Sequence, residues 1–153
     1  MYQPNNTNGG QHTNFQFRPG ESPFKPEYDE YIMSYPGRGT LKIQISAANE
    51  AFPIKDVDIN VAMIYQGVRY SLYTDSTNSS GIVDNMVLPA RAMDLILAPE
   101  TSDADEAHYL VSLYHPSFHP IIDKVITVYD RIETILPITM APDIENHRRT
   151  EGN

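Results

Sequence analysis

The stretch that decides the fold lies between residues 40 and 89, and its clearest segments are Leu41-Lys42-Ile43-Gln44-Ile45 and Val57-Asp58-Ile59-Asn60-Val61-Ala62-Met63. In both segments apolar residues recur at every second position. Because successive side chains of a strand point to opposite faces, this alternation predicts strands with one buried and one solvated side. The loop between them contains Pro53, which cannot donate to a strand ladder, so the two segments are predicted as separate strands.

Short apolar segments separated by turn residues continue along the chain, a pattern typical of an all-β sandwich. The expected strands cover residues 41–46, 57–65, 68–74, 82–88, 93–97, 108–114, 121–128 and 132–140. Asp75 and Gly81 bound a polar turn between two of them. There the Asp75 carboxylate is expected to accept backbone N–H bonds, and Gly81 is expected to take a positive φ.

Residues 1–38 form a separate zone, rich in Asn, Gln, Gly and Pro and poor in aliphatic residues. This composition predicts a disordered arm, followed by a sandwich over residues 39–142 and a flexible charged tail over residues 143–153. The arm is either an inert leader or an assembly arm that adds a strand to a neighbour's sheet edge. In the second case Tyr28, Tyr31 and Ile32 are the expected contact residues. In either case, deletion of residues 1–35 is expected to leave a folded, monomeric sandwich.

Charge and composition exclude several classes of protein. The 11 Lys and Arg against 20 Asp and Glu give a net charge of −9, which disfavours binding to nucleic acid or to an anionic membrane surface. No apolar run approaches the roughly 20 residues of a membrane-spanning helix, and the first residues lack the features of a Sec signal peptide. We therefore expect synthesis in the cytoplasm and no membrane insertion. The absence of cysteine excludes disulfides and thiolate sites.

From residue 40 to residue 141 the chain resembles the carboxypeptidase regulatory-like domain, a transthyretin-like (prealbumin-type) Greek-key β-sandwich. Residues 52–61 (FPIKDVDINV) are similar to the family's P-I-x-x-A-x-V-x-V segment, and Thr74-Asp75 with Gly81-Ile82 to its T-D-x-x-G turn. Leu88-Pro89 and residues 109–114 (YLVSLY) resemble two further strand segments. Residues 131–142 are similar to the closing strand of a clostridial subtype that accompanies peptidoglycan-binding and spore cortex-lytic proteins. The turn at residues 76–80 is longer than in the family, and residues 115–120 replace its Gly-Tyr.

Catalytic signals are absent from the sequence, which contains no G-x-S-x-G, P-loop, H-E-x-x-H or dinucleotide-binding motif. We therefore predict a protein that is not an enzyme and needs no cofactor. Candidates for a metal site are His115 and His119, with a third ligand from His108 or from an acidic-loop residue such as Asp103, Asp105 or Glu106; solvated loop histidines are the alternative. The same loop is a weak candidate for calcium. An isopeptide crosslink from Lys42 is not expected, because residues 132–140 contain no Asn.

These observations predict a non-catalytic structural, assembly or attachment module. The expected partner is a protein or a second copy, bound through the N-terminal arm or an edge strand on a spore or envelope structure. The alternative is a module that binds peptidoglycan or another glycan, or an accessory domain of a cell-wall (cortex) lytic enzyme. The 10 tyrosines of the chain supply stacking surfaces for that alternative.

Overall fold

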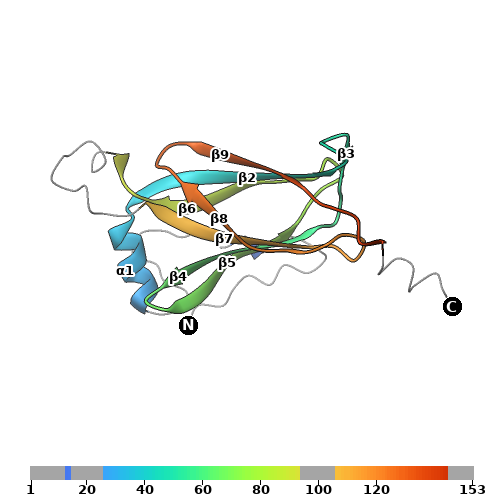
Figure 1. The fold of residues 1–153 in the computed structure, drawn as a ribbon. Helices are drawn as coiled ribbons and strands as arrows, with labels where there is room; N and C mark the ends of the chain where they lie inside the picture. Colours follow the sequence, from blue (N-terminus) through green and yellow to red (C-terminus); the bar gives the residue numbers. More distant parts are fainter. Residues whose placement is uncertain (1–12, 15–25, 94–105, 145–153) are drawn as a thin grey trace.

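The computed structural model describes residues 13–14, 26–93 and 106–144, which form two stacked β-sheets and the helix α1 (Figure 1). The elements are β1 (Thr13–Asn14), α1 (Pro26–Ser34), β2 (Gly37–Ala47), β3 (Phe52–Pro53), β4 (Asp58–Tyr65), β5 (Val68–Ser76), β6 (Ile82–Ala90), β7 (Ala107–Tyr114), β8 (Ile121–Val128) and β9 (Glu133–Thr139). Sheet A has the order β1-β5-β4-β7-β8, and sheet B contains β3, β2, β6 and β9. The predicted all-β sandwich is confirmed.

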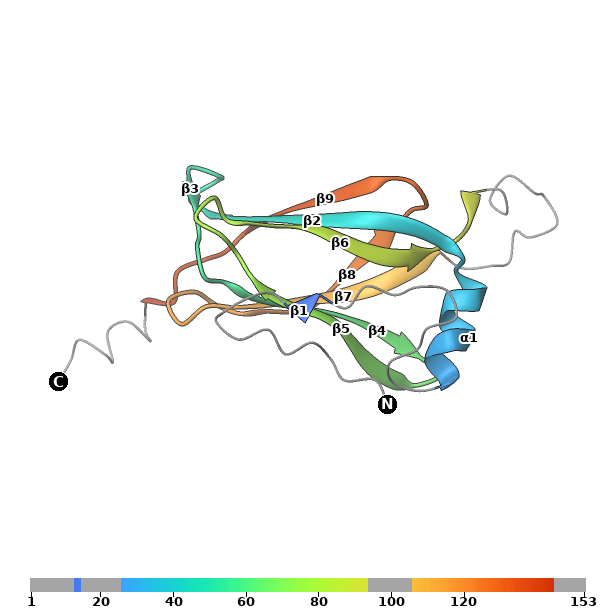
Figure 2. The same ribbon diagram turned by 180° about the vertical axis from the view of Figure 1, so that it is seen from behind.

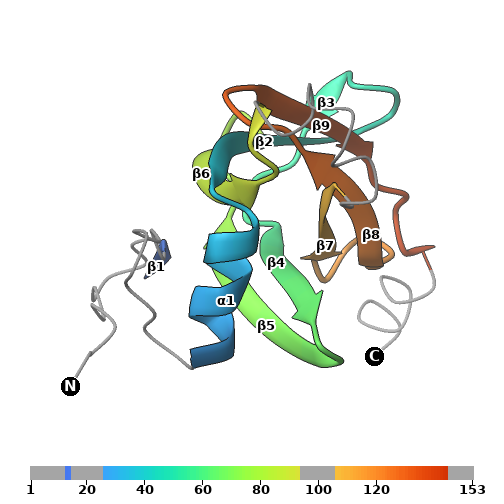
Figure 3. The same cartoon turned by 90° about the vertical axis from the view of Figure 1, so that its left-hand side faces the viewer.

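The chain crosses repeatedly between the sheets, as an end-on view shows (Figure 3). It passes from β2 in sheet B to β4 in sheet A, back to β6, again to β7, and finally from β8 to β9. In sheet B, β2 pairs antiparallel with β6 and parallel with β9. Seven of the expected strands lie at the expected places. The expected strand at 93–97 is not supported at Met93, which lies in no strand, and residues 94–97 lie outside the described part of the chain.

The core lies between the two sheets and follows the alternation of the sequence. Leu41, Ile43 and Ile45 of β2 point inward and are buried, whereas Lys42 and Gln44 between them are half-buried on the outer face. Strand β4 follows the same alternation, with Ile59, Val61 and Met63 buried, except that Ala62 between the last two is buried as well. Burial of apolar area at about 25 cal/mol per Å² is the main term that stabilises such a packed pair of sheets.

The expectation of a disordered arm is wrong from residue 26 onward, because α1 lies across one end of the sandwich (Figure 1). Ile32 is only 2% exposed and Tyr31 only 4%, so the α1 residues predicted to contact a neighbour's sheet edge fill this chain's own core. Tyr28 also lies in α1 rather than in a strand. The sequence does carry signals for this helix: Pro26 suits a first helical position, and Pro36 disfavours continuation. Among the described residues no helix is long and apolar enough to span a membrane.

Tyr31 anchors α1 through an aromatic cluster at the end of the sandwich. Its ring centroid lies 4.8 Å from that of Tyr35, 5.5 Å from that of Tyr65 and 6.4 Å from that of Tyr109. The last two contacts are edge-to-face, which is a favoured geometry for aromatic pairs. Burial raises the pKa of the Tyr31 hydroxyl. The helix is therefore part of the domain, and the domain begins at residue 26 or before.

Asp130 is a buried carboxylate that holds the same end of the sandwich together. It accepts hydrogen bonds from the backbone nitrogens of Arg38 (2.9 Å) at the start of β2 and of Met93 (3.0 Å) after β6. The Arg131 guanidinium lies 3.7 Å away. The backbone N–H groups of Met93 and Arg38, in that order, hold the pKa of Asp130 below its usual range. The negative charge of Asp130 therefore stabilises the folded state.

We expect Asp130→Asn to lower the free energy of unfolding at pH 7 by roughly 2 kcal/mol, because hydrogen bonds to a charged acceptor are lost. The pKa is lowered on folding, so this stabilisation is present above the unfolded pKa of about 3.9 and disappears as the pH falls through the folded pKa. Urea unfolding at pH 7 and in acid measures both effects, with the exposed Asp58→Asn as control. An equal loss at both pH values would show that the charge plays no part.

Candidate functional site

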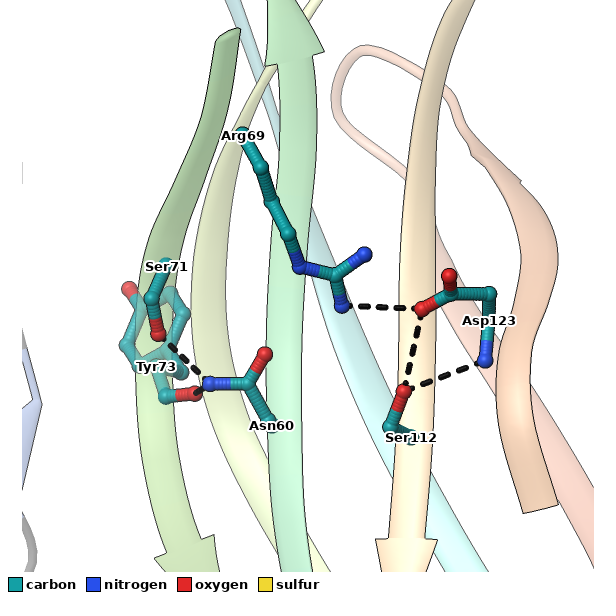
Figure 4. Close-up of polar contacts among 6 residues, drawn as sticks. All are labelled: Asn60, Arg69, Ser71, Tyr73, Ser112 and Asp123. Carbon is teal, nitrogen blue, oxygen red and sulfur yellow. Dashed lines mark hydrogen bonds and ion pairs between the residues drawn. The ribbon is translucent and has the colours of Figure 1, made fainter.

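Polar side chains cross the outer face of sheet A from β5 to β8 (Figure 4). The Arg69 guanidinium lies 2.8 Å from Asp123, whose carboxylate accepts a hydrogen bond from the Ser112 hydroxyl at 3.2 Å. The Asn60 amide donates to the Ser71 hydroxyl at 2.5 Å. The hydrogen bond from Arg69 holds the pKa of the Asp123 carboxyl below its usual range. These contacts fix side chains on the solvated face and join all four long strands of the sheet.

The Arg69 side chain extends along the outer face of sheet A. Its side chain crosses β4 toward β7 on the way to Asp123 (Figure 4). Ala62 faces the same side of β4 as Asn60, two residues earlier, and yet is completely buried. Long cationic side chains such as Arg69 can lie along apolar surface.

A shallow hollow of about 240 Å³ lies on the outer face of sheet B, where β2, β3, β6 and β9 meet. Its polar lining consists of the Gln44 amide, the Ser46 and Ser80 hydroxyls and the Glu50 carboxylate. An amide and hydroxyls both donate and accept hydrogen bonds, and an ionised carboxylate accepts them. The hollow therefore offers mixed hydrogen-bonding capacity with one negative charge.

Glu50, the acidic residue that lines this hollow, lies in a turn with a strained backbone. Ala48, Asn49 and Glu50 have φ angles of 51°, 54° and 72°, and the Ala51 nitrogen closes the turn on the Ala48 oxygen at 3.2 Å. Left-handed conformations cost non-glycine residues about 1–2 kcal/mol each, and such strain is found preferentially at functional sites. The surrounding hairpin of β2 and β3 therefore keeps Glu50 in a conformation that it would not adopt by itself.

The lateral edge of sheet B at β6 is sealed by tyrosines from the opposite sheet. The Tyr73 hydroxyl donates to the Val87 oxygen at 2.7 Å and accepts from the Val87 nitrogen at 3.1 Å. The Tyr109 hydroxyl donates to the oxygen of Pro89, which has no N–H of its own. Burial raises the pKa of Tyr73 to about 12, so its hydroxyl remains a donor at neutral pH. The outward backbone groups of Val87 and the outward oxygen of Pro89 are thus already satisfied.

The edge at β9 is protected by Pro137. The Met140 nitrogen donates to the Ser46 oxygen of β2 at 2.9 Å. Because alternate residues of a strand direct their N–H groups to opposite sides, residue 137 has its nitrogen on the outer side, where proline offers no donor. Proline on the outer side of an edge strand discourages further pairing. In sheet A, the β5 edge pairs with β1 at Thr74 and Tyr73, as seen in Figure 2.

The remaining edge, β8, exposes apolar side chains. Ile122 is 68% exposed and Val125 is 62% exposed, although strand β8 pairs with β7 along its other side. Within the described residues no strand covers the outer side of β8. A register shift at residues 111–113 of β7, opposite Asp123 with its φ of 52°, shows a bulge in this pair. The bulge twists the edge without hiding the apolar residues.

The structure does not bring the three candidate metal-binding histidines together. His108 is in β7, with its Nδ1 3.0 Å from the Thr127 hydroxyl, whereas His115 follows the far end of that strand. The positions are seven residue steps apart, which corresponds to about 23 Å at the rise of an extended strand. His119 lies in the next loop, where its backbone nitrogen donates to the backbone oxygen of Ala141. No cluster of His, Cys, Asp or Glu suited to a metal ion exists in the described ranges, and the acidic loop at 99–105 lies outside them.

The predicted turn residues have different roles. Gly81 has a positive φ of 72°, as expected, but Asp75 lies within β5 and accepts from the Ser76 nitrogen at 2.6 Å. The turn is instead built by Thr77 and Asn78. The Asn78 side-chain oxygen accepts from the nitrogens of residues 80 and 82, and the buried Thr77 hydroxyl donates to the Ile54 oxygen at 2.7 Å. An Asn before Ser-Ser-Gly is a known turn former, so this signal was present in the sequence.

Comparisons with known proteins give distant structural similarities. No protein-family model and no curated protein matches the chain. The solved structures that are similar include the Bacillus anthracis TIE protein (16% identity, TM-score 0.47), Klebsiella pneumoniae 5-hydroxyisourate hydrolase (19%, 0.39) and the shaft pilin SpaA from Lactobacillus rhamnosus GG (11%, 0.40). The match to the TIE protein covers 69% of this chain and 17% of the TIE protein chain. The match to the hydrolase covers 68% of this chain and 85% of the hydrolase chain, and the match to the pilin covers 69% of this chain and 50% of the pilin chain. At these identities and TM-scores the matches carry no argument about function.

Proposed function

We propose that this chain is a non-catalytic attachment or assembly module of a spore or envelope structure, and that it associates with a second copy through β8. The observation that carries the proposal is the difference between β8 and the other lateral edges. Tyr73 and Tyr109 bond to β6, β9 presents Pro137, and β5 pairs with β1 at Tyr73 and Thr74. Among the described strands, β8 has a side that no strand covers and carries two strongly exposed apolar residues, Ile122 and Val125. Strand β3, with exposed Phe52, is only two residues long, and β9, with exposed Ile135, presents Pro137.

The physical basis of the contact is β-strand addition. An edge strand offers N–H and C=O groups in a row, and a second strand satisfies them while its side chains bury apolar neighbours. Pairing of β8 with its own copy about a two-fold axis requires no other partner, and such two-fold contacts are the commonest in soluble oligomers. The Asp123 bulge, exposed Lys124 and the net charge of −9 all oppose tight pairing. We therefore expect association that strengthens with protein concentration and with added salt.

The test replaces both exposed apolar residues of β8, in the double variant Ile122→Lys and Val125→Lys. We expect the wild type to dimerise with rising concentration and the variant to dimerise roughly tenfold more weakly or not at all, because apolar contact is lost and charge is added. Sedimentation velocity across a wide concentration range measures the association. Ile135→Lys on β9, an apolar residue 51% exposed, is the matched control and should behave as the wild type.

Two results would contradict the proposal. A wild type that stays monomeric at the highest concentration excludes self-association. A double variant that associates as strongly as the wild type excludes β8 as the contact. Circular dichroism of each variant confirms that the sheets are intact.

We also infer that the chain is a carboxypeptidase regulatory-like domain of the clostridial subtype, from the motifs at residues 52–61, 74–82 and 131–142. That subtype also motivates a second candidate function: binding to peptidoglycan or another glycan, alone or as an accessory domain of a lytic enzyme. The hollow on sheet B favours this candidate, since its lining has the hydrogen-bonding groups that a carbohydrate requires. Co-sedimentation of the protein with purified peptidoglycan tests it directly.

A further inference from the structure

We infer that the hollow on the outer face of sheet B is a subsite for one uncharged sugar residue of a glycan strand. This inference deepens the second candidate function and is independent of association through β8. It rests on the chemistry of the lining, on the apolar floor between the polar groups, and on the strained turn that holds Glu50.

The polar groups of the hollow suit a ligand with several hydroxyls. Glu50 accepts hydrogen bonds when ionised, Gln44 both donates and accepts, and the Ser46 and Ser80 hydroxyls do the same. A sugar ring carries hydroxyls around its rim, each of which is both donor and acceptor. A strongly anionic ligand does not suit the site, because its one charged lining residue is itself negative and the chain carries a net charge of −9.

The apolar residues provide a floor for the ring. Pro53, Ile82 and Pro137 lie among the polar groups and come from three different strands. Proline rings and an isoleucine side chain give a firm apolar surface, against which the C–H groups of a sugar ring can pack. Pro137 therefore has two roles, since it also removes a donor from the outer side of β9.

The backbone makes the hollow rigid before any ligand binds. Ala48, Asn49 and Glu50 are held in left-handed conformations, and Gly81 beneath the rim is fixed because its oxygen accepts from the Ile45 nitrogen at 2.7 Å. A site held in shape by its scaffold loses less conformational entropy on binding. The openness of the hollow to solvent suits one residue within a long polymer, whose neighbouring residues continue past the site on either side.

The experiment is a titration of ¹⁵N-labelled full-length protein with two neutral probes, N,N′,N″-triacetylchitotriose and maltotriose, followed by NMR. We expect the amide signals of residues 44, 46, 50, 80 and 82 to shift with at least one probe. Glu50→Gln and Gln44→Ala should each weaken that binding roughly tenfold, which corresponds to about 1.4 kcal/mol. The matched control is Glu133→Gln, an exposed carboxylate on β9 outside the hollow, which should leave the binding unchanged.

Comparison of triacetylchitotriose, maltotriose and peptidoglycan distinguishes the possible results. Shifts with triacetylchitotriose alone identify an N-acetylated sugar, and shifts with both probes identify recognition of hydroxyls; either result supports the subsite. No shifts up to the solubility limit of both probes, or shifts that map elsewhere, overturn it. If the wild type and the Glu50→Gln variant co-sediment equally with peptidoglycan, glycan binding stands and the hollow is excluded as its site.

Discussion

Gly81→Val is expected to lower the free energy of unfolding by roughly 3 kcal/mol or more. Gly81 has a φ of 72°, where a β-branched residue is strained whatever the space around it. Space is also lacking: a Cβ at this position would lie 2.3 Å from the backbone oxygen of Ile45 and 3.1 Å from the backbone nitrogen of Ile54. These two atoms belong to the β2–β3 pairing, so relief of the clash would disrupt the sheet.

Ser79→Val is the control for this prediction, because Ser79 is an exposed residue of the same turn. We expect it to change stability by no more than about 0.5 kcal/mol. Urea unfolding followed by circular dichroism gives both midpoints. Equal midpoints for the two variants would show that the close approach of residue 81 to β2 does not exist in solution.

Ile32→Ala is expected to destabilise the protein by about 3 kcal/mol, although residue 32 lies in the zone whose composition predicts disorder. Its side chain is 2% exposed and belongs to the core cluster that joins the two sheets. Removal of its buried methyl and methylene groups leaves a cavity beneath α1. Met33→Ala, one residue along the helix and 79% exposed, should cost less than about 0.5 kcal/mol.

Deletion of residues 1–35 extends the same test. Contrary to the expectation drawn from composition, we predict a lower unfolding midpoint and a broader thermal transition, since Tyr31 and Ile32 are removed together from the core. Differential scanning calorimetry compares the truncated and full-length chains. A truncated protein with an unchanged transition would mean that α1 does not dock in solution.

The sequence by itself determined the positions of the strands. The alternation from Leu41 to Ile45 and from Ile59 onward needs only the two-residue period of a strand, which is a local property. The sequence also predicted a positive φ at Gly81, because glycine is the residue that adopts such a conformation at least cost. The role of Asn78 was readable in the same local way from turn chemistry, whereas the Thr77 hydroxyl bonds to Ile54 and Val57, which lie far from it in the chain.

The tertiary structure decided the rest, because the deciding contacts join residues far apart in the chain. A helix of nine residues has little stability alone, so α1 depends on Tyr31 and Ile32 being covered by strands that follow it. The sealing of β6 by Tyr73 and Tyr109 depends on how the two sheets face each other. The hollow likewise collects residues 44, 50, 80 and 137, which only the pairing of β2 with β3, β6 and β9 places together. The alternation of apolar and polar side chains decides which residues form strands, and long-range packing decides which surfaces of those strands stay exposed.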